Sequence, residues 1–225
     1  MIVLHILNGD FPLSRLFCAA VARRGVAALF VKMPYYGPRR QPGVDRRMVS
    51  IDPNETVEGT TQAVLDIRFA TAWLASRPEV DDKQLGVFGI SLGGITGALA
   101  ASAEPRLKKL CLVLAGGDVA RIVWESSVVE EAWLAKGKTR EEFFDLLKQI
   151  DPVTYAKNLR GRRILMINAT EDEIVPKACT ESLWSALGEP EIVWHPGGHY
   201  SIAKRFFSIL GRSIRFFDPA AKSPP

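Results

Sequence analysis

The sequence predicts one α/β domain over residues 1–225, with a mostly parallel, twisted sheet of about six strands and helices on both faces. Three observations predict this fold class. Apolar runs of strand length alternate with amphipathic stretches of helical length, which is typical of a parallel sheet covered on both sides. The 225 residues and a hydrophobic content of 47% suffice for one full core. A glycine-rich turn, Gly89-Ile90-Ser91-Leu92-Gly93, joins a strand-like run to a helix-like run in the middle of the chain.

The first part of the chain predicts three strands and two helices. The strands are Ile2–Leu7, Val26–Met33 and Leu85–Ile90, and each is an apolar run that ends at turn-forming residues. A helix from Pro12 to Arg24 begins with proline in its first turn and ends before a glycine. A longer helix from Glu55 to Ser76 has apolar side chains at helical spacing.

The second part continues the alternation after one interruption. A small-residue helix, Leu92–Ala103, precedes a strand at Leu110–Leu114. Residues 119–157 then have two helical patterns and no strand, which is too long for an ordinary connection. We therefore expect a small helical lid there, packed on the core through its aromatic side chains. The remaining expected elements are strand Ile164–Asn168, helix Lys177–Leu187, strand Glu191–His195 and helix Ser201–Phe217.

Charge and cysteine content exclude several classes of function. The formal net charge is +4 and the paired basic residues are scattered, so no nucleic-acid partner is expected. No apolar stretch reaches membrane-spanning length, and no membrane partner is expected. Cys18, Cys111 and Cys179 are far apart, which favours free thiols and a cytoplasmic location. Because no cluster has metal-ligand spacing, neither a metal nor an organic cofactor is expected.

Ser91 is the predicted nucleophile. A G-x-S-x-G turn between a strand and a helix lifts the serine hydroxyl clear of the sheet, and the flanking residues must be small because the turn leaves no room for side chains. The helix N-terminus then directs backbone N–H groups at negative charge that forms beside the serine. The competing interpretation is a strand-to-helix turn with an idle serine.

A serine nucleophile needs a base, and the chain has three histidines. His5 lies within the first predicted strand, which favours a role in the core. His199 follows the last predicted strand in a flexible turn, and sites in parallel sheets lie beyond the carboxyl ends of strands. We therefore predict His199 as the base, with His195 as the alternative.

The base in turn needs a carboxylate to orient it. The loop after strand Ile164–Asn168 contains Glu171, Asp172 and Glu173. Asp172 is the predicted triad acid because of its central position and short side chain, and the two glutamates are interpreted as solvated loop residues. Asp118, just past strand Leu110–Leu114, is the alternative acid.

Five short motifs in this order resemble the α/β-hydrolase fold family, in the style of its dienelactone-hydrolase-like and acetyl-esterase-like branches. They are Pro34–Gly37, Gly89–Gly94, Asp151–Pro152, Asp172–Pro176 and Gly197–His199, and together they extend over nearly the whole chain. The resemblance agrees with the chain order Ser, Asp, His. Dienelactone hydrolases proper have cysteine as the nucleophile, and serine here makes that reaction a less direct expectation.

The resemblance also implies an oxyanion hole. Its first donor would be the backbone N–H of Leu92. The second would come from the loop after the first strand, where Asn8 and Gly9 are the predicted donors. The family often has His-Gly-x-Gly in this loop, and this chain departs from that pattern.

A second departure concerns the sheet edge. Family members usually have two strands before the strand that leads to the oxyanion loop, whereas this sequence begins almost on it. The strand Val26–Met33 then becomes an edge although it is apolar on both faces. We expect this edge to be covered by a second copy, giving a homodimer, or by a preceding segment that the sequence lacks.

The expected activity is hydrolysis of a small carboxylic ester through an acyl-enzyme intermediate. A thioesterase or a peptidase would use the same three residues. The other alternative is a catalytically silent hydrolase-fold protein that binds a small ligand, which the altered oxyanion loop favours and the intact triad candidates oppose.

Overall fold

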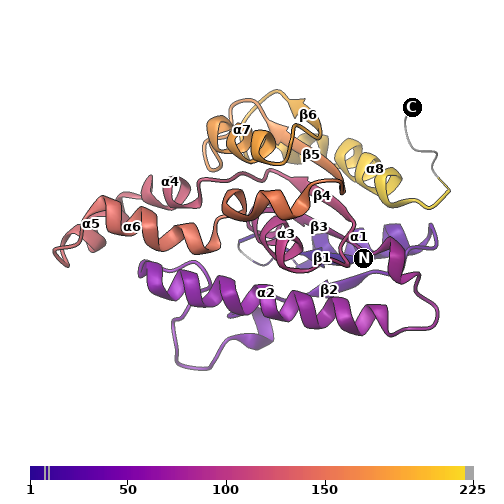
Figure 1. Cartoon of the computed structure of the whole chain (residues 1–225), viewed down its shortest axis with the longest axis horizontal. Helices are drawn as coiled ribbons and strands as arrows, with labels where there is room; N and C mark the ends of the chain where they lie inside the picture. Colours follow the sequence, from indigo (N-terminus) through magenta and orange to yellow (C-terminus); the bar gives the residue numbers. More distant parts are fainter. Residues whose placement is uncertain (8, 10, 221–225) are drawn as a thin grey trace.

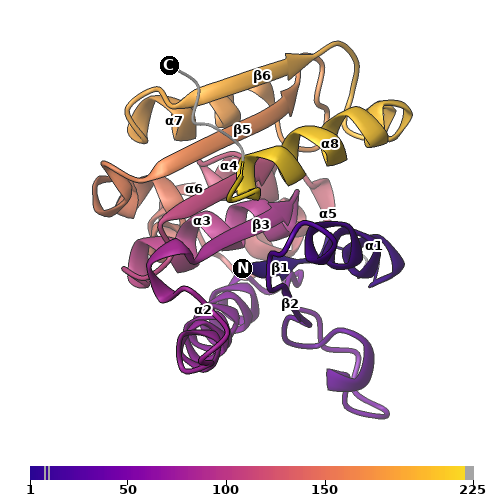
Figure 2. The ribbon, with the colours of Figure 1, turned by 90° about the vertical axis from the view of Figure 1, so that its right-hand side faces the viewer.

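The computed structural model describes residues 1–7, 9 and 11–220, and these contain one six-stranded sheet (Figure 1). All five pairs of neighbouring strands are parallel, and the strand order is β2-β1-β3-β4-β5-β6. Figure 2 shows β2 and β6 at the two edges. The strands are β1 (Ile2–Leu4), β2 (Leu29–Val31), β3 (Gly86–Ile90), β4 (Lys109–Val113), β5 (Arg163–Ala169) and β6 (Glu191–His195). The α/β fold predicted from the alternating pattern is confirmed.

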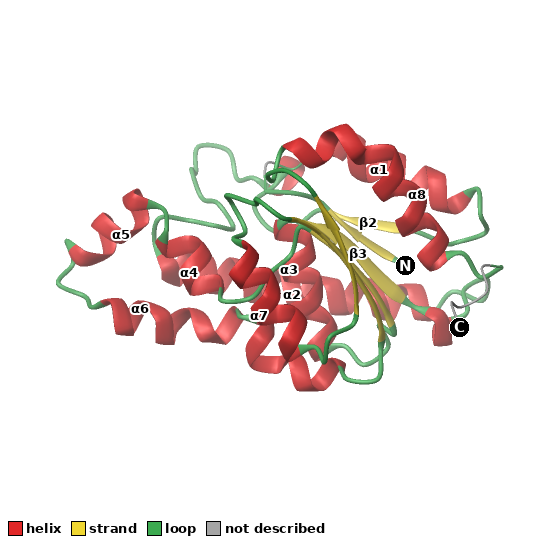
Figure 3. Ribbon diagram, turned by 90° about the horizontal axis from the view of Figure 1, so that it is seen from above, coloured by secondary structure: helices red, strands yellow, loops and turns green. Residues whose placement is uncertain are grey.

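Successive side chains of the central strands enter two separate cores because they point to opposite faces of the sheet. In β1, Ile2 and Leu4 pack on one face and Val3 on the other. Helices α1 (Phe11–Ala22) and α8 (Phe206–Phe217) cover the face of Val3, and α2 (Pro53–Ala75), α3 (Leu92–Ala103) and α7 (Lys177–Ala186) cover the opposite face (Figure 3).

Residues 119–157 form a helical insertion between β4 and β5. Its elements are α4 (Val119–Trp124), α5 (Ser127–Leu134), α6 (Arg140–Leu147) and the 3-10 segments η3 (Lys148–Ile150) and η4 (Pro152–Leu159). Trp124 and Trp133 pack edge-on against the fully buried Phe143. This cluster extends onto side chains of α2 and α3, and Figure 3 shows the insertion at the end of the molecule away from α1 and α8.

The outer strands are shorter than the apolar runs that predict them. The runs 2–7 and 26–33 give ladders of three residues each. The ladders end where a side chain replaces a backbone partner, because the N–H of Met33 donates to Nε2 of His5 at 3.0 Å. The last predicted helix is also divided, with a 3-10 segment η5 (Ser201–Arg205) before α8.

The three cysteines are free thiols, and Cys111 and Cys179 are buried. Burial raises the pKa of Cys111 to about 12 and that of Cys179 to about 11, so both are protonated at neutral pH. Among the described residues, no helix combines the length and the apolar character needed to cross a membrane.

Candidate active site

Ser91 occupies a strained turn between β3 and α3. Its φ of 54° and ψ of −119° are uncommon for a residue with a side chain. The turn is held by backbone bonds on both sides: the Ser91 N–H donates to the carbonyl of Val113 at 2.8 Å, and the Ser91 carbonyl accepts from Gly94 at 2.8 Å. Glycine is required at position 93 because a Cβ there would lie 2.6 Å from the carbonyl oxygen of His5. Close packing against β1 therefore fixes where the serine hydroxyl lies.

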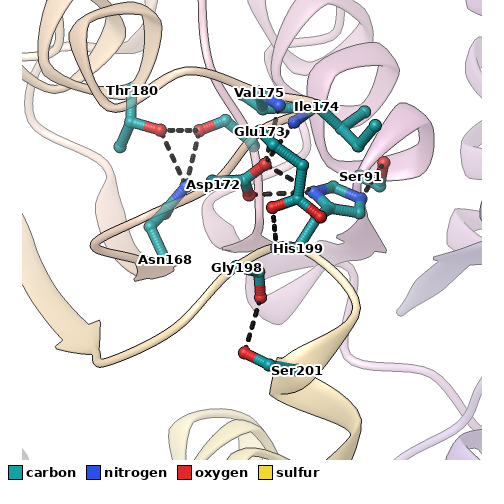
Figure 4. Close-up of polar contacts among 11 residues, drawn as sticks. Ser91, Asn168, Asp172, Glu173, Ile174, Val175, Thr180, Gly198, His199 and Ser201 are labelled. Atoms are coloured by element: carbon teal, nitrogen blue, oxygen red, sulfur yellow. Dashed lines mark hydrogen bonds and ion pairs between the residues drawn. The ribbon is translucent and has the colours of Figure 1, made fainter.

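The three predicted catalytic side chains meet in a continuous hydrogen-bonded chain (Figure 4). Nε2 of His199 lies 3.0 Å from Oγ of Ser91, and Nδ1 of His199 lies 2.9 and 2.8 Å from the two carboxylate oxygens of Asp172. All three residues are buried, with 8 to 9% of their surface exposed. This is the arrangement in which an imidazole can take the proton of a serine hydroxyl while a carboxylate fixes its tautomer.

Asp172 is oriented by the backbone of its own loop, which follows β5. One carboxylate oxygen accepts the N–H groups of Ile174 at 2.9 Å and Val175 at 2.7 Å. The end of β5 is tied to the end of β4 by Asn168, whose amide donates to the carbonyl of Ala115 at 2.8 Å. The carboxylate therefore has one well-defined direction, toward His199.

Glu173 has a role that its sequence context does not reveal. Its carboxylate accepts the backbone N–H of His199 at 2.9 Å (Figure 4). A Cβ at Gly198 would collide with this carboxylate, so glycine leaves the room that the contact needs. Glu173 is an exposed loop residue, as interpreted from the sequence, and this bond adds a contact with the histidine loop that was not predicted. Only the combination of Glu173 with a glycine just before the histidine could have indicated it.

The alternative residues lie elsewhere. His5 is 1% exposed, donates from Nδ1 to the carbonyl of Ile6 and accepts from Met33, and burial lowers its pKa. His195 ends β6, and burial, followed by Arg205 and Arg212, lowers its pKa. Asp118 is the N-cap residue before α4, with a φ of 52°, and both carboxylate contacts of the His199 ring are with Asp172.

The predicted oxyanion donors have three different outcomes. Leu92 is the first residue of α3, where a backbone N–H has no acceptor within the helix. The N–H of Gly9 donates to the carbonyl of Ile6 at 2.9 Å, so a turn already uses the donor expected there. Asn8 lies outside the described residues. The described residues of this loop that line the same cleft as Ser91 are Ile6 and Leu7.

A cleft of about 510 Å³ opens beside Ser91, and we refer to it as the Ser91 cleft. The described lining residues include no charged side chain, and four apolar or aromatic residues in the lining (Leu7, Ile174, Tyr200 and Phe207) are also well exposed. The lining residues are Ile6, Leu7, Leu13, Ile90, Ser91, Val113, Leu114, Ile174, His199, Tyr200, Phe206, Phe207 and Ile209.

None of these described lining residues belongs to the insertion at 119–157. The insertion packs on α2 and α3, while the Ser91 cleft is bordered by α1, α8 and the loop of His199 and Tyr200. The aromatic residues of the expected lid pack on one another and on α2 and α3, as predicted, and the described lining of the Ser91 cleft comes from other parts of the chain. Within the described part of the chain, no group of histidine, cysteine or acidic side chains could hold a metal ion.

Residues 58–195 match the model of the prolyl oligopeptidase family, and since this is more than half of the chain, the protein belongs to that family. It is also 30% identical over 204 residues to the uncharacterized protein Rv2627c of Mycobacterium tuberculosis. That match includes 88% of this chain and 46% of the relative, so the chain spans about half the length of the curated relatives it matches.

Solved structures of esterases have the same fold. Acetyl xylan esterase from Paenibacillus sp. R4 superposes with a TM-score of 0.72 at 24% identity, over 94% of this chain and 73% of that one. A cold-adapted esterase from an Arctic intertidal metagenomic library gives 0.66 at 18% identity, over 98% and 82%. The chain therefore has the α/β-hydrolase fold that its motifs resemble.

Proposed function

We propose that this protein is a serine hydrolase that cleaves a small carboxylic ester through an acyl-enzyme intermediate. The observation that carries the proposal is the chain of contacts from Asp172 through His199 to Ser91, at the edge of an apolar cleft. Esterases among the structural neighbours support the same class of reaction.

Each residue then has a defined step. His199 Nε2 removes the proton of Ser91 as Oγ bonds to the substrate carbonyl carbon, and Asp172 stabilises the imidazolium that forms. The Leu92 N–H, with a backbone donor near Leu7, stabilises the oxyanion. Collapse of the tetrahedral intermediate breaks the ester C–O bond, and His199 gives its proton to the departing alkoxide. Water, deprotonated by His199, then releases the acid and restores Ser91.

The proposal is tested by fluorophosphonate labelling followed by mass mapping, which requires an activated serine and not merely a pocket. We expect labelling at Ser91 in the wild type and none in Ser91→Ala; His199→Ala should reduce it to background although the serine remains. Ser201→Ala removes a nearby hydroxyl that donates to the Gly198 carbonyl, and it should leave labelling intact. Absence of labelling in folded wild-type protein would favour the silent, ligand-binding alternative.

A peptidase is the second candidate, and the family match is the observation that favours it. A panel of aryl esters, thioesters and peptide anilides with the same acyl group separates the activities. Ester hydrolysis without anilide cleavage supports the esterase, whereas cleavage of the anilide at a comparable rate would replace it with the peptidase.

The cellular location and the oligomeric state are two further proposals. The free state of all three thiols supports a reducing, cytoplasmic location. The edge position of β2 supports a homodimer, which a measurement of the oligomeric state in solution would test.

A further inference from the structure

A second cavity adjoins the Ser91 cleft and differs from it in chemistry. It has a volume of about 300 Å³, and we refer to it as the arginine pocket. Leu7 lines both cavities, so the two meet at this residue. The lining residues of the arginine pocket are Leu7, Tyr35, Tyr36, Arg40, Arg47 and Val49.

The loop that forms this pocket has two pairs of arginines, and the first member of each pair is bound to α2. Arg39 donates to the carboxylate of Asp66 at 2.6 Å and to the carbonyl of Lys32 at 2.8 Å. Arg46 donates to the carboxylate of Glu58 at 2.5 Å. These contacts hold the loop on one face of α2, since Glu58 and Asp66 are eight residues apart.

The second arginine of each pair lines the arginine pocket and, among the described residues, forms no ion pair with α2. Arg40 donates from Nε to the carbonyl of Tyr35 at 3.2 Å, and no carboxylate of the described residues pairs with it. Arg47 lies 3.6 Å from the carboxylate of Asp45, which is 90% exposed and therefore a weak partner. Two guanidinium groups thus border the arginine pocket, and the described residues occupy few of their N–H donors.

The two tyrosines of the arginine pocket contribute a neutral hydrogen-bond donor and a rigid aromatic side of the pocket. Tyr36 is 6% exposed, and burial raises the pKa of its hydroxyl to about 12 against the opposing effect of Arg40 and Arg47, so the hydroxyl stays protonated. Tyr35 has a φ of 66°, and its ring lies 4.7 Å from the guanidinium of Arg46. A strained residue fixed in this way keeps the wall in place.

We propose that the arginine pocket binds an anionic group, a carboxylate or a phosphate, on the same ester whose carbonyl reaches Ser91. This inference rests on the proposed function, because it names the class of ester. Paired guanidinium forks bind oxyanions bidentately, and a neutral tyrosine hydroxyl supplies a further donor. The uncharged part of the substrate would lie in the Ser91 cleft, on the other side of Leu7.

The test uses matched pairs of esters. 4-Nitrophenyl butyrate and 4-nitrophenyl hydrogen glutarate differ in a carboxylate on the acyl side, and phenyl butyrate and 4-(butyryloxy)benzoate differ in one on the alcohol side. We expect kcat/KM to favour the charged member of one pair by about tenfold, and this preference to decrease with rising salt. The double variant Arg40→Gln/Arg47→Gln should remove the preference, and Arg40→Lys/Arg47→Lys should keep part of it.

Arg23→Gln is the matched control, because it removes one exposed arginine in the turn after α1 and should leave the preference as it is. An equal charged-to-neutral ratio in wild type and double variant would overturn the inference while leaving ester hydrolysis established. Calorimetric titration of glutarate and of inorganic phosphate into Ser91→Ala protein tests the pocket without turnover. Binding that is lost in the arginine double variant supports the pocket even if no ester is cleaved, and absence of binding of both anions contradicts it.

Discussion

His199 is held at three points, two on its ring and one on its backbone. The ring contacts Ser91 and Asp172, and the backbone N–H donates to Glu173. The loop that contains His199 begins with Gly197, which has a φ of 108°. Because glycine can adopt many backbone conformations, Gly197 alone does not fix the path of the loop. The Glu173 carboxylate holds the backbone of His199 itself, and the Glu171 N–H and the Ser201 hydroxyl hold the two glycines before it.

Glu173→Ala should slow fluorophosphonate labelling of Ser91 by about tenfold, the effect of losing one charge-assisted hydrogen bond. Glu173→Gln keeps an acceptor oxygen and should restore most of the rate. Glu171→Ala is the control, because that residue is equally exposed and contacts the histidine loop through its backbone N–H and not through its carboxylate. Equal rates for the alanine and glutamine variants would assign Glu173 no positioning role.

His5 should make stability depend on pH. Its folded pKa is lowered below 6.5 by burial, so the unfolded chain binds more protons between the two values and the free energy of unfolding rises with pH there. The stabilisation is present above pH 6.5 and is lost as the pH falls through the folded pKa.

Urea unfolding at several pH values between about 5 and 8 measures this slope. The slope should decrease in His5→Gln, whatever the change in absolute stability, and should not vanish, because the pKa of His195 is also lowered. An unchanged slope would show that His5 does not titrate in this range.

The spacing of the sequence was enough to nominate Ser91, Asp172 and His199, which the fold brings together. It could not identify Glu173, because three adjacent acidic residues look alike until the backbone of His199 is placed next to one of them. Gly9 was predicted as an oxyanion donor, but a local turn already uses its N–H. The sequence alone does not reveal which backbone donors remain available.

At the level of elements, the turn between β3 and α3 stores backbone strain at Ser91. Ser91→Ala and Ser91→Gly both remove the nucleophile, but only glycine adopts a φ of 54° without cost. We expect the glycine variant to be the more stable of the two by about 1 kcal/mol, and labelling to be lost in both. Thermal unfolding of the pair measures the difference, and at Ser102, inside α3, the order should be reversed. A more stable alanine variant at position 91 would contradict strain in this turn.

The insertion and the cleft should respond to mutation separately. Phe143 is fully buried among the aromatic residues of the insertion, whereas Phe207 lines the Ser91 cleft with 83% of its surface exposed. Phe143→Ala should lower the free energy of unfolding by about 3 to 5 kcal/mol and leave the labelling rate of folded protein unchanged.

Phe207→Ala should leave stability nearly unchanged and lower kcat/KM for esters with longer apolar acyl groups more than for acetyl esters. Chemical unfolding and an ester series of increasing chain length give the two readouts. A large loss of labelling in folded Phe143→Ala protein would support the interpretation of residues 119–157 as a lid.

Periodicity located every strand, but it could not set their lengths or the role of the insertion. The apolar run over residues 2–7 continues past its ladder because His5 packs with the aromatic rings of Phe11 and Tyr36 instead of extending the sheet. The aromatic residues of the insertion were expected to pack on the core, and they do. What they cover depends on the direction of α4, which no local pattern contains.

For the whole molecule, the open side of the sheet is the main unexplained surface. β2 is an edge strand, and its three residues are only half-buried (Figure 2). The neighbouring helix α2 exposes Leu65, Phe69 and Trp73, at 40, 74 and 50%, at four-residue spacing. An apolar stripe beside an unpaired strand edge is typical of a surface that another protein surface covers.

We therefore expect a twofold dimer in which the β2 edges lie side by side and the α2 stripes pack together. Sedimentation velocity over a range of protein concentrations should show a monomer–dimer equilibrium, and Phe69→Glu should shift it to monomer because the dimer would bury a charge at an apolar contact. Phe207→Glu is the matched control, since that exposed phenylalanine lies on α8, which covers the other face of the sheet. A wild type that remains monomeric at every concentration would contradict the dimer, and equal association of the two glutamate variants would place the contact elsewhere than on α2.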